Sequence, residues 1–144
     1  MKNLIISILL GACLVLTSCQ TPTAKAILSN APNVINVVGP VAVSKGVTKQ
    51  PKAAPYLKDL VVVINTFALG SDLSPETLAA TIKTAKVKEL QTPEALNVAN
   101  ALVALYKAYY DTAVTNKIAS VEYLVPILQA ISNAITQGLP VVTQ

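Results

Sequence analysis

The sequence predicts an all-α protein, a small bundle of four to five helices, and three observations carry this prediction. Apolar residues recur at spacings of three and four through most of the chain. Two segments open with a hydroxyl residue, proline and glutamate, which is typical of a helix start: Ser74-Pro75-Glu76 and Thr92-Pro93-Glu94. The chain has 144 residues and is 53% hydrophobic but only 12% charged, so it can bury one apolar core.

The first 18 residues have the plan of a secretory signal. Lys2 gives a basic start, and an apolar run of 13 residues follows, from Leu4 to Leu16. This run is shorter than the ~20 residues of a transmembrane helix. It ends in Leu16-Thr17-Ser18-Cys19, which resembles the bacterial lipobox: an aliphatic residue, two small residues and a cysteine. The resemblance covers this N-terminal segment alone, and the residues after it identify no family.

The lipobox resemblance implies a covalent membrane anchor. In lipoproteins the cysteine thiol receives a diacylglyceryl group, and a peptidase then cuts before that residue. Here this implies cleavage between Ser18 and Cys19, lipidation of Cys19 and a mature chain held on a membrane by acyl chains such as palmitate. The alternatives are an ordinary signal peptide cut near Ser18, or an uncleaved anchor. Because Gln20 rather than Asp follows the cysteine, the outer membrane, facing the periplasm, is favoured in a Gram-negative host.

Residues 19–32 are expected to be a lipidated cysteine and flexible tether, because they are polar, small and marked by proline. Residues 33–144 form the expected helical domain. Its first part, residues 33–50, is ambiguous: its β-branched residues allow hairpin strands, but helical spacing relates Val34, Val37, Val38, Val41 and Lys45. We favour a helix that is kinked or broken at Gly39-Pro40.

Four further helices are expected over residues 52–69, 74–86, 93–116 and 120–137. In the first, Pro55 suits the first turn and Gly70 a C-cap. In the last, Ser120 is the expected cap, Pro126 predicts a late start or a kink, and Gly138-Pro140 closes the helix. The predicted apolar stripes are Leu57, Leu60, Val61, Ile64, Phe67 and Ala68; Leu96, Ala99, Leu102, Leu105, Tyr106 and Tyr109; and Tyr123, Leu124, Ile127, Leu128, Ile131 and Ile135.

The residue inventory argues against an enzyme, a metal site and a cofactor. The chain has no His, and after cleavage its one remaining cysteine is acylated, so neither a usual general base nor a zinc ligand is left. The seven carboxylates show no close pair, and the sequence contains no Gly-rich phosphate loop. Arg is absent too, and the ten lysines of the mature chain are scattered, so nucleic acid is not an expected partner.

One aromatic and polar group on the 93–116 segment is a candidate interaction surface: Tyr106, Lys107, Tyr109, Tyr110 and Asp111. Tyrosine combines apolar area with a hydrogen-bonding tip, which suits protein interfaces. The alternative is that Tyr106 and Tyr109 are core residues whose hydroxyls reach solvent. Lys107 and Tyr110 are therefore the residues expected to contact a partner.

These observations favour a lipoprotein that presents a small helical structural or interaction domain in the cell envelope. Its partners would be the membrane, through the lipid, and an envelope protein or a second copy of the chain. The overall look is also similar to small lipoproteins that accompany prophages, which implies an alternative role as a phage- or plasmid-borne factor in exclusion, immunity or lysis. A binding site for a small apolar ligand between helices is a third alternative.

Overall fold

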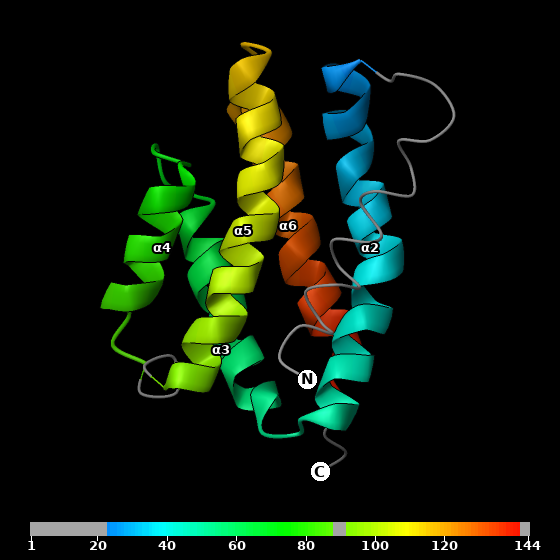
Figure 1. Cartoon of the computed structure of the whole chain (residues 1–144), viewed down its shortest axis with the longest axis vertical. Coiled ribbons are helices and arrows are strands. Elements are labelled where there is room, and N and C mark those ends of the chain that lie inside the picture. The colour runs from blue at the N-terminus through cyan, green and yellow to red at the C-terminus, as the bar shows by residue number, and fades with distance from the viewer. Residues whose placement is uncertain (1–22, 88–91, 142–144) are drawn as a thin grey trace.

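The chain is seen here as a computed structural model, which describes residues 23–87 and 92–141. Over these ranges it forms five α-helices and no strand: α2 (Ala24–Lys49), α3 (Ala53–Phe67), α4 (Pro75–Thr84), α5 (Pro93–Thr115) and α6 (Val121–Gly138). Successive helices alternate in direction, so α2 and α6 run the same way and pack side by side (Figure 1). The predicted all-α bundle is confirmed, and the alternative of hairpin strands in residues 33–50 is wrong.

The starts of α4 and α5 follow from local chemistry and match the prediction. The Ser74 hydroxyl oxygen accepts a hydrogen bond from the Thr77 N–H at 3.3 Å. The Thr92 hydroxyl oxygen accepts one from the Ala95 N–H at 3.2 Å. In both helices proline takes the first position, where its missing N–H costs nothing. Each start is therefore encoded within four residues.

The start of α2 corrects the predicted tether. The helix begins at Ala24, and the Thr23 hydroxyl accepts a hydrogen bond from the Ala26 N–H at 3.3 Å. Residues 24–32 are thus helical, and Leu28 and Ala31 among them are buried in the core. Proline inside a helix costs roughly 3 kcal/mol because a hydrogen bond is lost and its ring crowds the preceding turn. Burial of Leu28 and Ala31 in the turn before Pro32 offsets that cost, so the helix continues through the proline.

The contact between α2 and α6 accounts for Gly39 and Gly138, which the sequence predicts to be a helix break and a helix stop. A Cβ atom on Gly39 would lie 2.5 Å from the Cβ of Ala134, and one on Gly138 would lie 2.5 Å from the Cβ of Val43. Both glycines are helical, so Gly39-Pro40 does not break α2, and Gly138 is the last residue of α6 rather than its stop signal. They are glycines because the two backbones approach too closely for a side chain.

The side of α2 that faces the core also differs from the prediction. Val37 and Val41 were expected in the apolar stripe, yet 74% and 54% of their surfaces are exposed. Val34 and Val38 are half-buried. The core side instead carries smaller residues among the larger ones: Leu28, Ala31, Ile35, Gly39, Ala42, Val43, Gly46 and Val47. Small residues allow close approach to α6, and that contact decides which side is inside.

The remaining helix ends are partly as expected. Pro55 lies in the first turn of α3, but the C-cap is Ala68 and not Gly70. α6 begins at Val121 and includes Pro126, so the predicted late start is wrong. After α5, Lys117 takes a left-handed conformation with φ of 56°, and the Ile118 N–H donates to the Ala113 carbonyl at 2.8 Å. This Schellman-type turn ends α5 without glycine.

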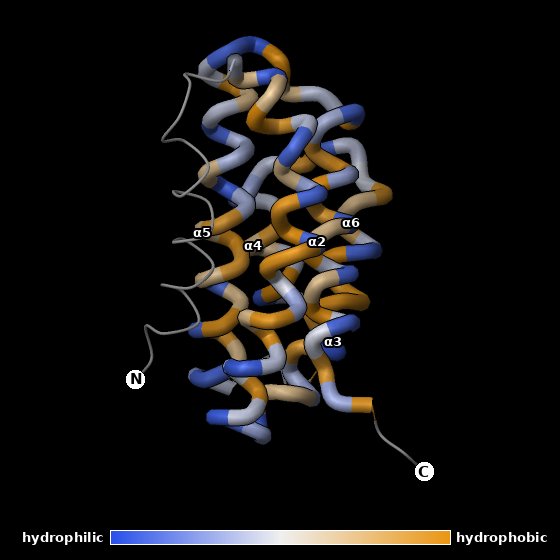
Figure 2. The backbone as a smooth tube through the Cα atoms, turned by 90° about the vertical axis from the view of Figure 1, so that its right-hand side faces the viewer, coloured by the Kyte–Doolittle hydropathy of each residue, from blue (hydrophilic) through white to orange (hydrophobic). Residues whose placement is uncertain are grey.

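The other apolar stripes are largely confirmed. Apolar and polar stretches follow one another along the backbone of the helices (Figure 2). Four predicted members are half-buried rather than buried: Val61, Ala68, Leu96 and Tyr123. The buried hydrophobic residues of α3, α5 and α6 are Ala53, Leu57, Leu60, Val63, Ile64 and Phe67; Ala95, Ala99, Leu102, Leu105, Tyr106, Tyr109 and Ala113; and Leu124, Ile127, Leu128, Ala130, Ile131, Ala134 and Ile135.

Candidate functional site

The predicted cleavage and lipidation residues, Ser18 and Cys19, lie outside the described residues. The first described residue is Thr23, the N-cap of α2, only four positions after Cys19. Four residues of extended chain span at most about 14 Å. A lipid on Cys19 would therefore hold the start of α2 close to the membrane surface, with no long tether in between.

The helix that follows Thr23 is itself apolar. Among the described helices, α2 is the one that is long and apolar enough to cross a membrane by length and composition, with a mean hydropathy of 1.4 over its best window of 18 residues. Only 33% of that window is buried inside the bundle. One side of α2 packs against α6, so the helix is a core element with apolar surface left over.

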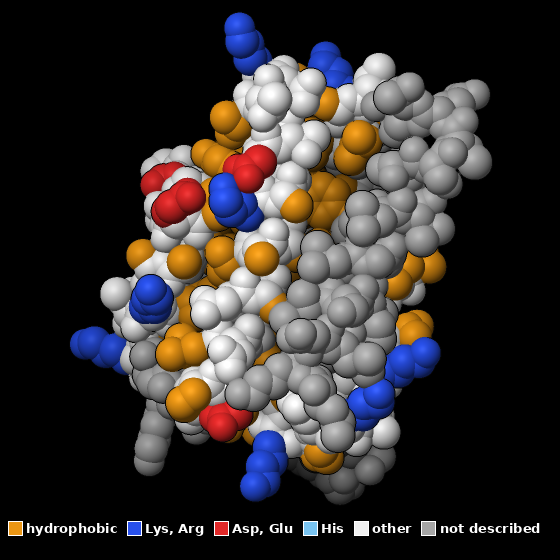
Figure 3. All heavy atoms as spheres, viewed as in Figure 1, with side chains coloured by type: hydrophobic (Ala, Val, Ile, Leu, Met, Phe, Trp, Pro, Cys, Tyr) orange, Lys and Arg blue, Asp and Glu red, His pale blue; other side chains and the backbone are white. Residues whose placement is uncertain are grey.

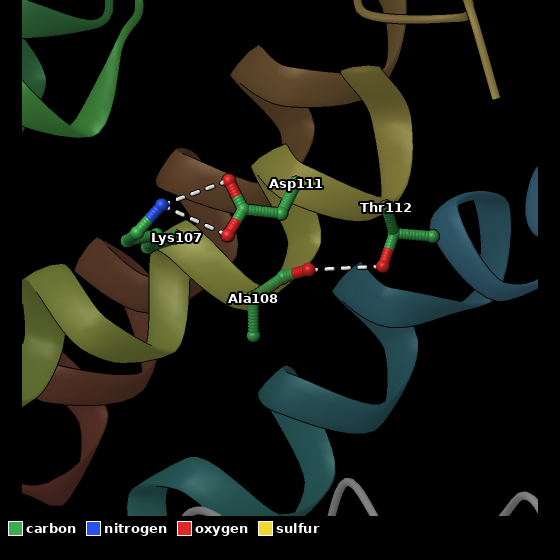
Figure 4. A network of polar contacts seen from close by, with 4 residues as sticks. All are labelled: Lys107, Ala108, Asp111 and Thr112. Atoms are coloured by element: carbon green, nitrogen blue, oxygen red, sulfur yellow. Dashed lines mark hydrogen bonds and ion pairs between the residues drawn. The ribbon is translucent and has the colours of Figure 1, made fainter. Parts of the chain in front are cut away.

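The candidate surface on α5 has its charges paired within the helix. The Lys107 ammonium lies 2.9 and 3.0 Å from the two carboxylate oxygens of Asp111, one turn further on (Figure 4). The same hydrogen bond raises the pKa of Lys107. About half of each side chain is exposed. Beside this pair, the Thr112 hydroxyl donates to the Ala108 carbonyl at 2.9 Å. The side-chain polar atoms of Lys107, Asp111 and Thr112 therefore have hydrogen-bond partners within α5 itself.

The tyrosines of this group divide between core and surface. Tyr106 is fully buried, and its hydroxyl donates to the Leu73 carbonyl at 2.7 Å, so the alternative in which this hydroxyl reaches solvent is wrong. Burial raises the pKa of Tyr106 well above its ordinary value. Tyr109 is also buried. Tyr110 is half-buried, and its ring centroid lies 6.2 Å from that of Tyr106, so part of its side chain remains accessible at the surface.

The acidic residue that the sequence left unassigned, Asp72, supports the start of α4. Its carboxylate accepts hydrogen bonds from the Thr77 hydroxyl and, at 3.0 Å, from the Ser74 N–H. These bonds, the one from Thr77 first, lower the pKa of Asp72. A carboxylate two residues before a serine N-cap is the signal in the sequence that could have indicated this role. Asp72 therefore has a structural function that needs no ligand.

The described residues offer no group of three or more His, Cys, Asp or Glu side chains placed to hold a metal ion. A shallow hollow of about 300 Å³ opens to solvent where α3 meets the end of α6. Its lining residues are Lys58, Val61, Thr136, Leu139, Pro140 and Val141. The hollow lies at the edge of the bundle, not between its packed helix faces, and it brings together no set of polar groups that would orient a ligand.

No known protein family, no curated protein and no solved structure matches this chain. Functional assignment therefore depends on the residues themselves and on where the fold places them.

Proposed function

We propose that this chain is a lipoprotein, anchored through acyl chains on Cys19, that presents a helical bundle as a structural or interaction domain in the cell envelope. The observation that carries the proposal is the order of its N-terminal features. A basic start, an apolar run and Leu16-Thr17-Ser18-Cys19 come in that order, and a capped helix begins five residues later. Each acyl methylene contributes ~0.8 kcal/mol to membrane binding, so two or three chains hold a protein stably.

The polar groups inside the described part of the chain serve the fold, as expected of a structural domain. Its buried side-chain nitrogen and oxygen atoms all have hydrogen-bond partners. The two groups that stand out, Asp72 and Tyr106, each serve the fold. A structural domain of this kind would bind a partner through its exposed surface. Lys107 and Tyr110 on α5 remain the candidate contact residues. In a Gram-negative host we place the protein at the outer membrane, facing the periplasm.

The anchor is tested by replacing each cysteine in turn and feeding the cells an alkyne analogue of palmitate. Cys19→Ala should abolish acyl labelling and leave the signal uncleaved, which makes the protein larger by 18 residues. The matched control is Cys13→Ala, which changes a cysteine within the apolar run and should leave labelling, size and membrane fractionation unchanged. A Cys19→Ala protein with the label, size and fractionation of the wild type would rule out lipidation at this residue. Phage plating and lysis assays on the same cells test the exclusion alternative.

A further inference from the structure

The solvent side of α2 carries apolar residues in its middle and basic residues towards its end. We define this outer face by Val37, Val41, Ser44 and Lys45, which helical spacing brings onto one side and which are all exposed. Val37 and Val41 are 74% and 54% exposed, so most of their apolar surface is in contact with solvent rather than with the core. Figure 3 shows this order along the right-hand edge, where α2 lies: apolar side chains above basic ones.

The charges of the bundle are sorted along its long axis. Around the end where α2 stops, the described residues include six lysines against two carboxylates: Lys45, Lys49, Lys52, Lys58, Lys83 and Lys86, with Asp59 and Glu94. The half where α2 starts has three lysines against four carboxylates: Lys25, Lys107 and Lys117, with Asp72, Glu76, Asp111 and Glu122. The strongest attraction for an anionic surface is therefore far from the anchor.

We propose that the outer face of α2 lies along an anionic lipid bilayer, so that the anchored bundle rests on its side. This inference rests on the lipid anchor proposed above. α2 has 26 residues and is about 39 Å long. The anchor holds its first turn near the membrane, the two valines meet the headgroup region in the middle, and Lys45 and Lys49 reach anionic headgroups at its end. Each lysine close to such a surface adds to the electrostatic attraction of the bundle for the membrane.

A bilayer fits this face better than a second copy of the chain does. α2 contains no Asp or Glu, so a second α2 would bring lysines and no carboxylate to the contact. Anionic lipid supplies the missing negative charge as well as an apolar layer for Val37 and Val41. The short connection from Cys19 to Thr23 also restricts the bundle to orientations in which the start of α2 stays at the bilayer.

The test uses the mature lipidated chain reconstituted into vesicles of phosphatidylcholine with or without phosphatidylglycerol. Because its one native cysteine is acylated, an introduced cysteine can be labelled alone with a fluorophore. Ser44→Cys places the label on the outer face of α2, and Ala80→Cys is the control, exposed on α4 at the opposite side of the bundle. Nitroxide lipids should quench the Ser44 label several-fold more than the Ala80 label in vesicles with phosphatidylglycerol. Adding Lys45→Gln and Lys49→Gln, or high salt, should reduce the difference.

Equal quenching of the two labels would overturn the inference, because it would mean that the bundle has no fixed side on the membrane. Energy transfer between Ser44 labels without lipid quenching would overturn it in favour of a second copy on this face. The anchor is scored separately, by flotation with the vesicles and by the mass of the N-terminal peptide. A protein that is acylated and floats, yet keeps its Ser44 label in water, refutes the resting orientation and leaves the anchor intact.

Discussion

At the scale of single residues, Tyr106 joins separate parts of the bundle. It projects from α5, its ring meets the edge of Phe67 at 6.4 Å, and its hydroxyl binds the backbone of Leu73 in the connection between α3 and α4. A buried carbonyl without its donor costs about 1–3 kcal/mol. Tyr106, which the sequence places in an apolar stripe and also in a candidate interaction surface, therefore stabilises the tertiary structure.

Tyr106→Phe should lower the free energy of unfolding of the mature chain by about 1–3 kcal/mol, because the Leu73 carbonyl loses its donor. The measurement is thermal or urea unfolding followed by circular dichroism. Tyr110→Phe is the matched control, since it removes a hydroxyl from a half-buried ring and should change stability little. Equal effects of the two substitutions would contradict the role given to the buried hydrogen bond.

The same hydroxyl predicts how stability changes with pH. Tyr106 has a raised pKa in the folded chain, whereas in the unfolded chain it titrates near 10. Above pH 10 the unfolded state releases this proton and the folded state keeps it, so unfolding is favoured and stability falls. Between pH 9 and 11 the wild type should lose more stability than Tyr106→Phe. Parallel pH curves for the two proteins would refute the raised pKa.

At the scale of helices, the packing of α2 on α6 depends on missing side chains. Gly39 lies opposite the Cβ of Ala134, and Gly138 lies opposite the Cβ of Val43. Each helix therefore has a glycine, without a side chain, where the other helix has a Cβ atom. Interiors are close-packed, and an added methyl group without space forces backbones or rotamers to move. Glycine in a helix interior, as at Gly39, costs helix propensity of roughly 1 kcal/mol. Close helix contact offsets that cost.

Gly39→Ala should destabilise the bundle by about 1–3 kcal/mol, despite the better helix propensity of alanine, because its Cβ would overlap that of Ala134. Ala134→Gly removes the opposing Cβ. The double variant Gly39→Ala with Ala134→Gly should therefore recover much of the stability lost in the first variant. A double-mutant cycle in urea measures this coupling. Additive losses would show that the two positions do not compete for the same space.

At the scale of the whole molecule, the folded body begins earlier than the composition of residues 19–32 indicates. Proline, serine and asparagine in this stretch are typical of a linker, yet Leu28 and Ala31 belong to the core. The folded bundle thus starts within four residues of the proposed lipid. If the proposed lipid is present, that short connection limits how far the domain can stand from a membrane, and the lysines gathered around the end of α2 lie at the far end of the bundle from the anchor.

Leu28→Ala should lower the free energy of unfolding by about 2–5 kcal/mol, because it leaves a cavity in the core. Val37→Ala, on the same helix but exposed, should stay within about 0.5 kcal/mol of the wild type. Calorimetry or chemical unfolding of the mature chain compares them. A silent Leu28→Ala would mean that the first turns of α2 do not belong to the folded body.

The sequence by itself determined the helical class, the starts of α4 and α5, most of the apolar stripes of α3, α5 and α6, and the prediction of a lipid on Cys19. Each depends on residues within a few positions of one another: a serine or threonine before Pro-Glu, apolar side chains at helical spacing, or a cysteine after an apolar run. Such signals act through local hydrogen bonds and periodicity, so they can be recognised in the sequence without knowledge of the tertiary structure.

Only the tertiary structure decided which side of α2 is buried, why Gly39 and Gly138 are glycines, and that the Tyr106 hydroxyl donates to the Leu73 carbonyl. In α2 both sides carry apolar residues, so periodicity alone cannot choose between them. The choice belongs to α6, about 90 residues further along the chain, whose small residues admit one side of α2 and leave Val37 and Val41 outside. The lysines that look scattered in sequence are likewise sorted only by the fold, because alternating helices bring the end of α2 and the end of α4 to the same part of the bundle.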